Sequence, residues 1–242
     1  AQEGRLTNPL VRGADGALHA ASWPEAVAAA AAGLARAKGH AAVLAGGRHT
    51  IEDAYAISKF ARVVLATDDV DFRSRALSEE ETEFLSSSVA GLGIGVTYED
   101  LEKAAHVVLI AFEPEDESPM IQLRLRKAVR RNRTRVTAIA SHATNGLKKL
   151  NAHVIMTKAG AEVPALVSAG IDANTIVLVG ERAASVPGLL SAVLNITRQN
   201  NAQLAWVPRR AGDRGAVDAG LLPGLLPGGR SLVDDASRAE VS

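Results

Sequence analysis

The 242-residue sequence has 27 Lys and Arg against 27 Asp and Glu, an aromatic share of 3% and no cysteine. The balanced charge and the scarcity of aromatic side chains predict no nucleic-acid partner, because nucleic acids need a basic field and single strands stack on aromatic rings. Without cysteine, this chain has no disulfide, thiolate zinc site, cysteine nucleophile or cysteine-bound iron–sulfur cluster.

The first part of the chain predicts a capped helix followed by a strand–helix–strand unit. Ser22 and Glu25 have the spacing of a capping box, and an Ala-rich helix follows to about residue 38. The apolar run 41–45 predicts a buried strand, Thr50 caps the next helix, and the apolar run 63–66 predicts a second strand. Such a unit is parallel and right-handed.

The middle of the chain predicts more helices and strands after a charged, irregular stretch at 68–75. In that stretch, Arg73 and Arg75 are expected to pair with the neighbouring carboxylates, so the acidic residues are not interpreted as a calcium loop. The expected elements are helices beginning at Ser78, Thr97 and Ser118, strands at 106–112, 136–140 and 153–156, and a short helix at 162–169.

The last part predicts one more strand–helix–strand unit, at 175–179, 187–200 and 203–207. Beyond Asp213 the Gly- and Pro-rich sequence predicts little regular structure, and residues 230–242 are expected to form a flexible tail. Alternating strands and helices predict an α/β fold with mainly parallel sheets.

Two glycine-containing segments are candidates for a nucleotide site. Gly91, Gly93 and Gly95 follow a polar helix rather than a strand, so a simple loop is favoured there. Gly46-Gly47-Arg48 does link a strand to a helix, where a ligand or another backbone could approach. With only two glycines, a tight turn is favoured, and these three residues remain weak, vestigial candidates for cofactor binding.

No catalytic or metal site is expected from the remaining residues. The six histidines lack metal-ligand spacing, and Ser86 to Ser88 lack the glycines of a nucleophile elbow. Glu113 and residues 115–117 precede a helix, where their charge would repel a phosphate. The basic run at 124–135 predicts a solvated helix face, with an acidic partner as the alternative.

The start of the sequence and its hydropathy add two expectations. No apolar run reaches the roughly 18–20 residues of a membrane span, so we expect no direct membrane insertion. The polar start AQEGR has no signal-peptide core and no initial Met, which predicts a processed or cut piece of a longer protein.

Several segments in series resemble the molybdopterin oxidoreductase superfamily. The matching segments are 4–12 (GRLTNPLVR), 22–26 (SWPEA), 46–55 (GGRHTIEDAY), 69–75 (DVDFRSR), 112–119 (FEPEDESP), 212–220 (GDRGAVDAG) and 226–229 (LPGG). The resemblance implies two Rossmann-like halves, one inserted into the other. Residues 1–75 and 173–229 would form the first half, and residues 76–172 the inserted second half.

The sequence departs from that superfamily where its members bind cofactor. Leu77 stands at the position of the metal ligand, and leucine offers no lone pair. Ser141 stands near the position of a guanine-reading Asp, so that carboxylate is missing. We therefore expect no cofactor, molybdenum, tungsten, iron or flavin in this chain.

Within the superfamily, the sequence at 69–75 and 213–230 most resembles the large iron–sulfur subunit of NADH-quinone oxidoreductase, respiratory complex I. This resemblance implies a scaffold domain of the respiratory electron-transfer arm with no redox centre of its own. Its partners would be other complex I subunits at the inner, cytoplasmic face of the plasma membrane, and iron–sulfur clusters would lie in an N-terminal region of the parent subunit. The alternatives are a cofactor-binding fragment of a formate-dehydrogenase-type molybdoenzyme and a free-standing NAD-binding Rossmann protein.

Overall fold

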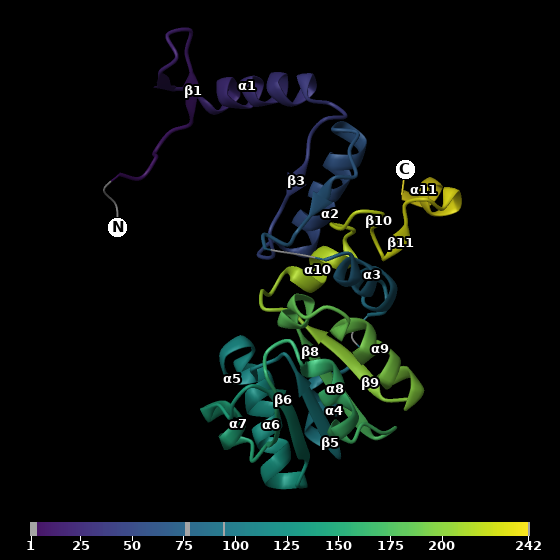
Figure 1. Cartoon of the computed structure of the whole chain (residues 1–242). Helices are drawn as coiled ribbons and strands as arrows, with labels where there is room; N and C mark the ends of the chain where they lie inside the picture. Colours follow the sequence, from purple (N-terminus) through teal and green to yellow (C-terminus); the bar gives the residue numbers. More distant parts are fainter. Residues whose placement is uncertain (1–3, 76–77, 94, 242) are drawn as a thin grey trace.

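A five-stranded parallel sheet forms the centre of the larger part of the molecule (Figure 1). The computed structural model describes residues 4–75, 78–93 and 95–241. The strand order is β7-β6-β5-β8-β9, and β5 and β8 are buried along their whole length, as apolar strands covered on both faces should be. The strands are β5 (His106–Ile110), β6 (Arg135–Ala140), β7 (His153–Met156), β8 (Thr175–Gly180) and β9 (Gln203–Val207).

Helices cover both faces of this sheet. Alternate residues of β5 divide between two cores: Val107 and Leu109 pack with Leu125 of α6, whereas Val108 and Ile110 pack with Leu189 of α9. The helical segments around the sheet are α3 (Glu79–Ser88), α4 (Tyr98–Lys103), α5 (Pro114–Glu117), α6 (Pro119–Asn132), α7 (Asn145–Lys149), α8 (Glu162–Ala165), η2 (Leu166–Ala169), η3 (Glu181–Ser185) and α9 (Leu189–Gln199).

A smaller layer combines segments from both ends of the sequence. The Arg62 guanidinium donates to the carbonyls of Gly220 and Leu222 at 2.9 and 3.0 Å, and the Asp68 carboxylate accepts the Gly224 N–H at 2.7 Å. Its elements are β3 (Val43–Leu44) and β4 (Val70–Asp71), which pair in parallel, α2 (Ile51–Lys59), the π-helix η1 (Phe60–Val64), α10 (Asp213–Asp218), and the antiparallel strands β10 (Leu225–Leu226) and β11 (Arg230–Ser231).

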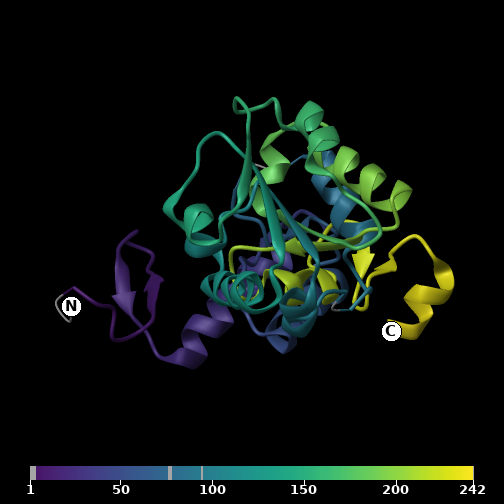
Figure 2. The same ribbon diagram turned by 90° about the horizontal axis from the view of Figure 1, so that it is seen from below.

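An N-terminal arm projects from this body, and the two termini lie on opposite sides of it (Figure 2). The arm consists of a hairpin, β1 (Leu10–Arg12) with β2 (Leu18–Ala20), and helix α1 (Trp23–Arg36), which has no buried residue. Helix α11 (Asp235–Val241) ends the described chain. Among the helices of the described residues, none combines the length and hydropathy required to cross a bilayer.

The α/β class with a parallel sheet is confirmed, and so are the capping box at Ser22–Glu25 and the helix that begins after Thr97. The prediction of a strand at 63–66 is wrong. Residues 63 and 64 lie in η1, and β3 pairs with β4 instead. A four-residue apolar run does not distinguish a strand from a buried helical turn.

The expectation of coil after Asp213 is also wrong. Helix α10 begins there, β10 and β11 form a small ladder, and α11 occupies most of the expected tail at 230–242. Glycines in this region provide turns rather than disorder: Gly220 and Gly228 have φ of 77° and 80°. These turns fold the segment back onto the smaller layer.

The expected halves, 1–75 with 173–229 and 76–172, do not divide the sheet. Strands β8 and β9 were expected apart from β5, yet β8 pairs with β5 from His106 opposite Thr175 to Ile110 opposite Val179. The boundary at 172 and 173 is therefore wrong for these strands, because a continuous ladder joins them. The contacts of Arg62 and Asp68 with 220–224 nevertheless bring the two sequence-distant parts of the first half together.

Candidate functional site

The strand order reverses between β5 and β8, and open parallel sheets bind ligands outside the carboxyl ends of strands at such a point. Glu113 follows β5 closely, and Glu181 follows β8 directly. The two strand ends are in close contact, since a Cβ on Gly180 would overlap the carbonyl oxygen of Ala111. We therefore take this edge of the sheet as the candidate functional site.

Glu113 is turned inward at this edge. The residue is only 8% exposed, and its Oε1 accepts the N–H of Glu115 at 3.3 Å at the start of α5. The Thr144 hydroxyl, from the N-cap of α7, donates to Oε2. A Cβ on Gly146 would overlap Oε1, so the carboxylate fits closely against the first turn of α7. The Glu113 carboxylate thus lies between the N-termini of α5 and α7.

A crevice of about 370 Å³ opens beside Glu113. Residues from the ends of β5, β6 and β8 line it, including Glu113, Asp116, Glu162, Arg182 and Ser141. Three carboxylates against one guanidinium give this crevice a negative charge balance. Ser141 is exposed, and its hydroxyl is 3.1 Å from His142 Nδ1.

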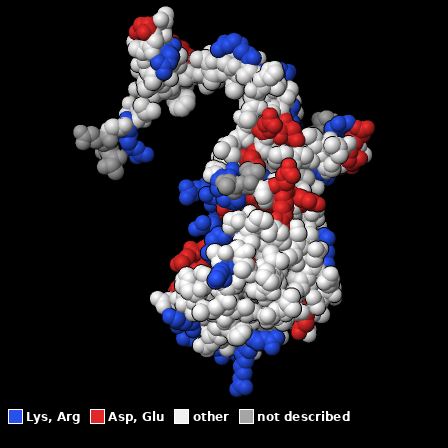
Figure 3. Space-filling model, in the orientation of Figure 1, with Lys and Arg blue, Asp and Glu red and all other residues white. Residues whose placement is uncertain are grey.

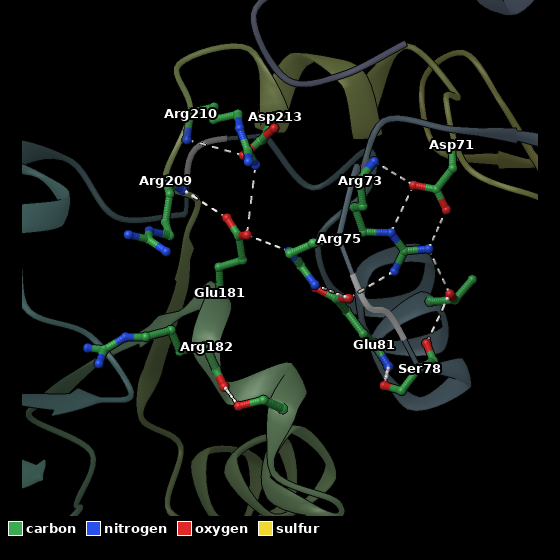
Figure 4. A network of polar contacts seen from close by, with 12 residues as sticks. Asp71, Arg73, Arg75, Ser78, Glu81, Glu181, Arg182, Arg209, Arg210 and Asp213 are labelled. Carbon is green, nitrogen blue, oxygen red and sulfur yellow. Dashed lines mark hydrogen bonds and ion pairs between the residues drawn. The ribbon is translucent and has the colours of Figure 1, made fainter. Parts of the chain in front are cut away.

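A charged cluster joins the end of β8 to the smaller layer (Figure 4). We define it as Asp71, Arg73, Arg75, Glu81 and Glu181. Arg73 is buried and contacts Asp71 at 2.7 Å and Glu81 at 3.1 Å. Arg75 reaches both Glu81 and Glu181. Burial alone would lower the pKa of Arg75, but these two carboxylates raise it above its ordinary value. The cluster is therefore a chain of ion pairs that share their charged groups.

Asp213 lies beside this cluster and is 1% exposed (Figure 4). Its Oδ2 accepts the Arg210 N–H at 3.2 Å, whereas Oδ1 has no hydrogen-bond partner among the described residues. Burial raises the pKa of Asp213 to about 6, and the Glu181 charge adds to that effect. The carboxylate is enclosed by Gly47, on which a Cβ would overlap Oδ1, so it has no space for a substrate on that side.

The weak candidates Gly46, Gly47 and Arg48 lie in the turn after β3. Gly47 is buried and its carbonyl accepts the Gly212 N–H at 3.0 Å, while Arg48 is exposed. The turn therefore meets another backbone at this point. Gly91 has a similar role, because a Cβ there would lie 2.6 Å from the Gly228 carbonyl oxygen. Leu77 lies outside the described residues.

A sequence model of the molybdopterin oxidoreductase family matches residues 5–188, which is most of the chain. The chain belongs to this family. It is 52% identical over 247 aligned positions to the G subunit of NADH-quinone oxidoreductase from Mycobacterium bovis, with 98% of this chain and 31% of that protein covered. It is 46% identical over 271 positions to the protein of the same name from Streptomyces coelicolor, with 100% and 32% covered.

The chain spans about a third of the length of those two relatives. A putative formate dehydrogenase of Staphylococcus haemolyticus is 35% identical over 129 positions, with 51% of this chain and 13% of that protein covered. The likeness to the G subunit therefore extends over nearly the whole chain, and the likeness to formate dehydrogenases over half of it.

The family name implies a molybdopterin cofactor, and the residues at the switch point do not fit its phosphate groups. The buried Glu113 carboxylate already accepts the N–H and hydroxyl donors that an anion would need there. Asp116 and Glu162 add negative charge to the adjoining crevice. Among the described residues, no group of three or more His, Cys, Asp or Glu side chains is placed so that it could hold a metal ion.

Glu181 and Asp213 were not identified from the sequence as parts of this site. Glu181 had one local signal, because it follows directly after an apolar strand in a parallel sheet. Asp213 had none, since its burial depends on Gly47, which is 166 positions earlier in the chain.

Proposed function

We propose that this chain is a redox-inert scaffold domain of an NADH-quinone oxidoreductase, within the G subunit of that complex. The observation that carries the proposal is the inward-facing Glu113, whose carboxylate fills the anion position at the switch point. The likeness to the G subunit supports the assignment to this complex. The chain's own residues then bind no cofactor, and iron–sulfur clusters belong to other regions of the parent subunit.

In this proposal the domain supports the electron-transfer arm and contacts other subunits of the complex at the inner face of the plasma membrane. The charged cluster gives it a rigid interior, because Arg75 connects α3 to the end of β8 through Glu81 and Glu181. A rigid domain can hold neighbouring redox subunits at a fixed spacing without transferring electrons itself.

Elemental analysis, absorption spectroscopy and calorimetric titration of the purified chain test the proposal. We expect no stoichiometric metal, no visible chromophore, no NADH oxidation with ferricyanide, and no heat signal with GDP or NADH. Glu113→Gln is the informative variant, because it removes the charge and keeps the side-chain size. Tight GDP binding by the unchanged chain, or a stoichiometric molybdenum or tungsten, would favour a formate-dehydrogenase-type molybdoenzyme. Tight NADH binding would favour an NAD-binding Rossmann protein.

A further inference from the structure

A large apolar groove of about 930 Å³ lies on the sheet face beside β8 and β9. Its floor includes Leu178, Ala205 and Val207, which belong to the core shared with α4 and α6. Its walls include Tyr98 of α4 and Met120 of α6, which are 49% and 45% exposed. Large apolar side chains thus surround a cavity that the described chain leaves open.

The position of the groove in the fold indicates that it needs a cover. Parallel sheets are stable when helices cover both faces. On this face α4 and α6 share a core with both β5 and β8, whose Leu178 is only 1% exposed, so the groove lies over the edge strand β9. Strand β9 is at the end of the sheet and pairs only with β8, so no further strand shields it within the described residues.

The charge around the groove indicates which partner fits it. Arg209, Arg210 and Arg214 line one side, and Glu117 is the only carboxylate among the lining residues. Arg209 is the most available of the three, since its side chain is 54% exposed and its ion pair with Glu117 is a long contact of 3.8 Å. Glu117 is already paired with Arg182 at 2.8 Å. Arg210 and Arg214 already pair with Glu181 at 3.9 Å and with Asp218 at 3.1 Å, so Arg209 is the arginine of this rim that can accept an incoming carboxylate.

The face drawn in Figure 3 is consistent with a local rather than a general basic surface. Lys and Arg gather on the arm, at the junction between the two parts of the body and at the far end of the sheet-bearing part, and the front of the sheet-bearing part is a broad uncharged surface. A partner recognised by charge would therefore be directed to a small number of places.

We propose that the groove is the docking site of an acidic amphipathic helix from a neighbouring polypeptide. The apolar face of that helix covers Tyr98, Met120 and Ala205, and a carboxylate on its polar face pairs with Arg209. This is the helix-in-groove mode of recognition, in which apolar anchors supply affinity and charge supplies orientation. This proposal rests on the scaffold function in one respect: that function implies that the helix belongs to a neighbouring subunit of the complex.

The chain contains a reporter for this test. Its two tryptophans are Trp23, which is 73% exposed on the arm, and Trp206, which lines the groove. Trp23→Phe leaves Trp206 as the only tryptophan; because Trp206 also packs against the core on the other face of the sheet, isothermal titration calorimetry measures binding alongside its fluorescence. The probes are two synthetic helices of about 18 residues, roughly five turns, with the same leucine face, one with Glu and one with Lys on the polar face.

We expect the acidic helix to change Trp206 fluorescence saturably and the basic helix to leave it unchanged. Arg209→Glu with Met120→Ser should weaken the acidic helix about tenfold or more, because it reverses one rim charge and removes one apolar wall. The matched control is Arg130→Glu with Leu123→Ser, which makes the same two kinds of change on α6 away from the groove.

Equal binding of both helices, no binding of the acidic helix, or equal weakening by the control variant would overturn the docking proposal. Circular dichroism of each variant establishes that it is folded before titration. These outcomes are separate from the scaffold function, because metal content and nucleotide titration test that function without any peptide.

Discussion

Asp213 provides the sharpest test of how the two parts of the molecule are joined. Burial raises its pKa from 3.8 to about 6, with Glu181 adding to the effect and Arg210 and Arg75 opposing it. A carboxyl with a raised pKa in the fold binds its proton more tightly in the folded state than in the unfolded state. Its ionisation therefore destabilises the fold, and the free energy of unfolding falls as pH rises from about 3.8 to about 6.

The difference between these two pKa values corresponds to about 3 kcal/mol, as an upper figure. By the same linkage, the free energy of unfolding decreases by about 2 kcal/mol between about pH 4.5 and about pH 7.5, which is most of this difference. The variant Asp213→Asn keeps an acceptor for the Arg210 N–H and cannot ionise. We expect it to exceed the unchanged chain in stability at about pH 7.5 by about 2 kcal/mol, with the advantage disappearing near pH ~4.

Urea unfolding followed by circular dichroism at a series of pH values measures this difference. Subtracting the two curves removes the contributions of the other carboxyls, because they are common to both proteins. Asp218→Asn is the control: this residue lies in the same helix and remains partly exposed. If the difference between Asp213→Asn and the unchanged chain is independent of pH, the burial argument is wrong.

Two further substitutions test the packing around the site. Glu81→Gln should lower the free energy of unfolding by about 3–5 kcal/mol, because it leaves the buried Arg73 partly unpaired, whereas Glu83→Gln on the exposed side of α3 should change it little; equal effects in urea unfolding would contradict this. Gly47→Ala should destabilise by about 1–3 kcal/mol, because its methyl group overlaps the Asp213 carboxylate, whereas a methyl group at Gly33 in α1 meets only the end of the Arg36 side chain, at 3.9 Å. A thermal midpoint unchanged by Gly47→Ala would refute the close approach.

The features predicted correctly from the sequence depend on neighbouring residues. The Ser22 hydroxyl accepts the Glu25 N–H, as the predicted capping box requires, because such a box needs only residues three positions apart. The helix predicted to begin at Thr97 is also present, with the Thr97 hydroxyl accepting the Asp100 N–H. The expectation that Arg73 pairs with the acidic stretch is confirmed by its contact with Asp71, two positions away. Contacts between residues that are close in the sequence can therefore be predicted without knowledge of the fold.

The features that were wrong or missed depend on distant residues. Arg75 was expected to pair within 68–71, yet it pairs with Glu81 and with Glu181, the latter 106 positions away. Residues 63 and 64 of the run 63–66 lie in a helical segment, in which Arg62 bonds to the carbonyls of Gly220 and Leu222 and Ala61 is fully buried. No local pattern contains these partners.

Several segments that carry the family resemblance contact one another or the charged cluster in the fold. The segments 46–55 and 212–220 meet where the Gly212 N–H bonds to the Gly47 carbonyl, and the segment 69–75 supplies the arginines of the charged cluster. In the segment 112–119, Glu113 holds the first turns of α5 and α7 together. These contacts are needed for the fold whether or not a cofactor is bound, so they preserve the resemblance while leaving the chemistry open. The decision between scaffold and enzyme therefore depends on charge at the switch point, where the Glu113 carboxylate accepts the Glu115 N–H and the Thr144 hydroxyl.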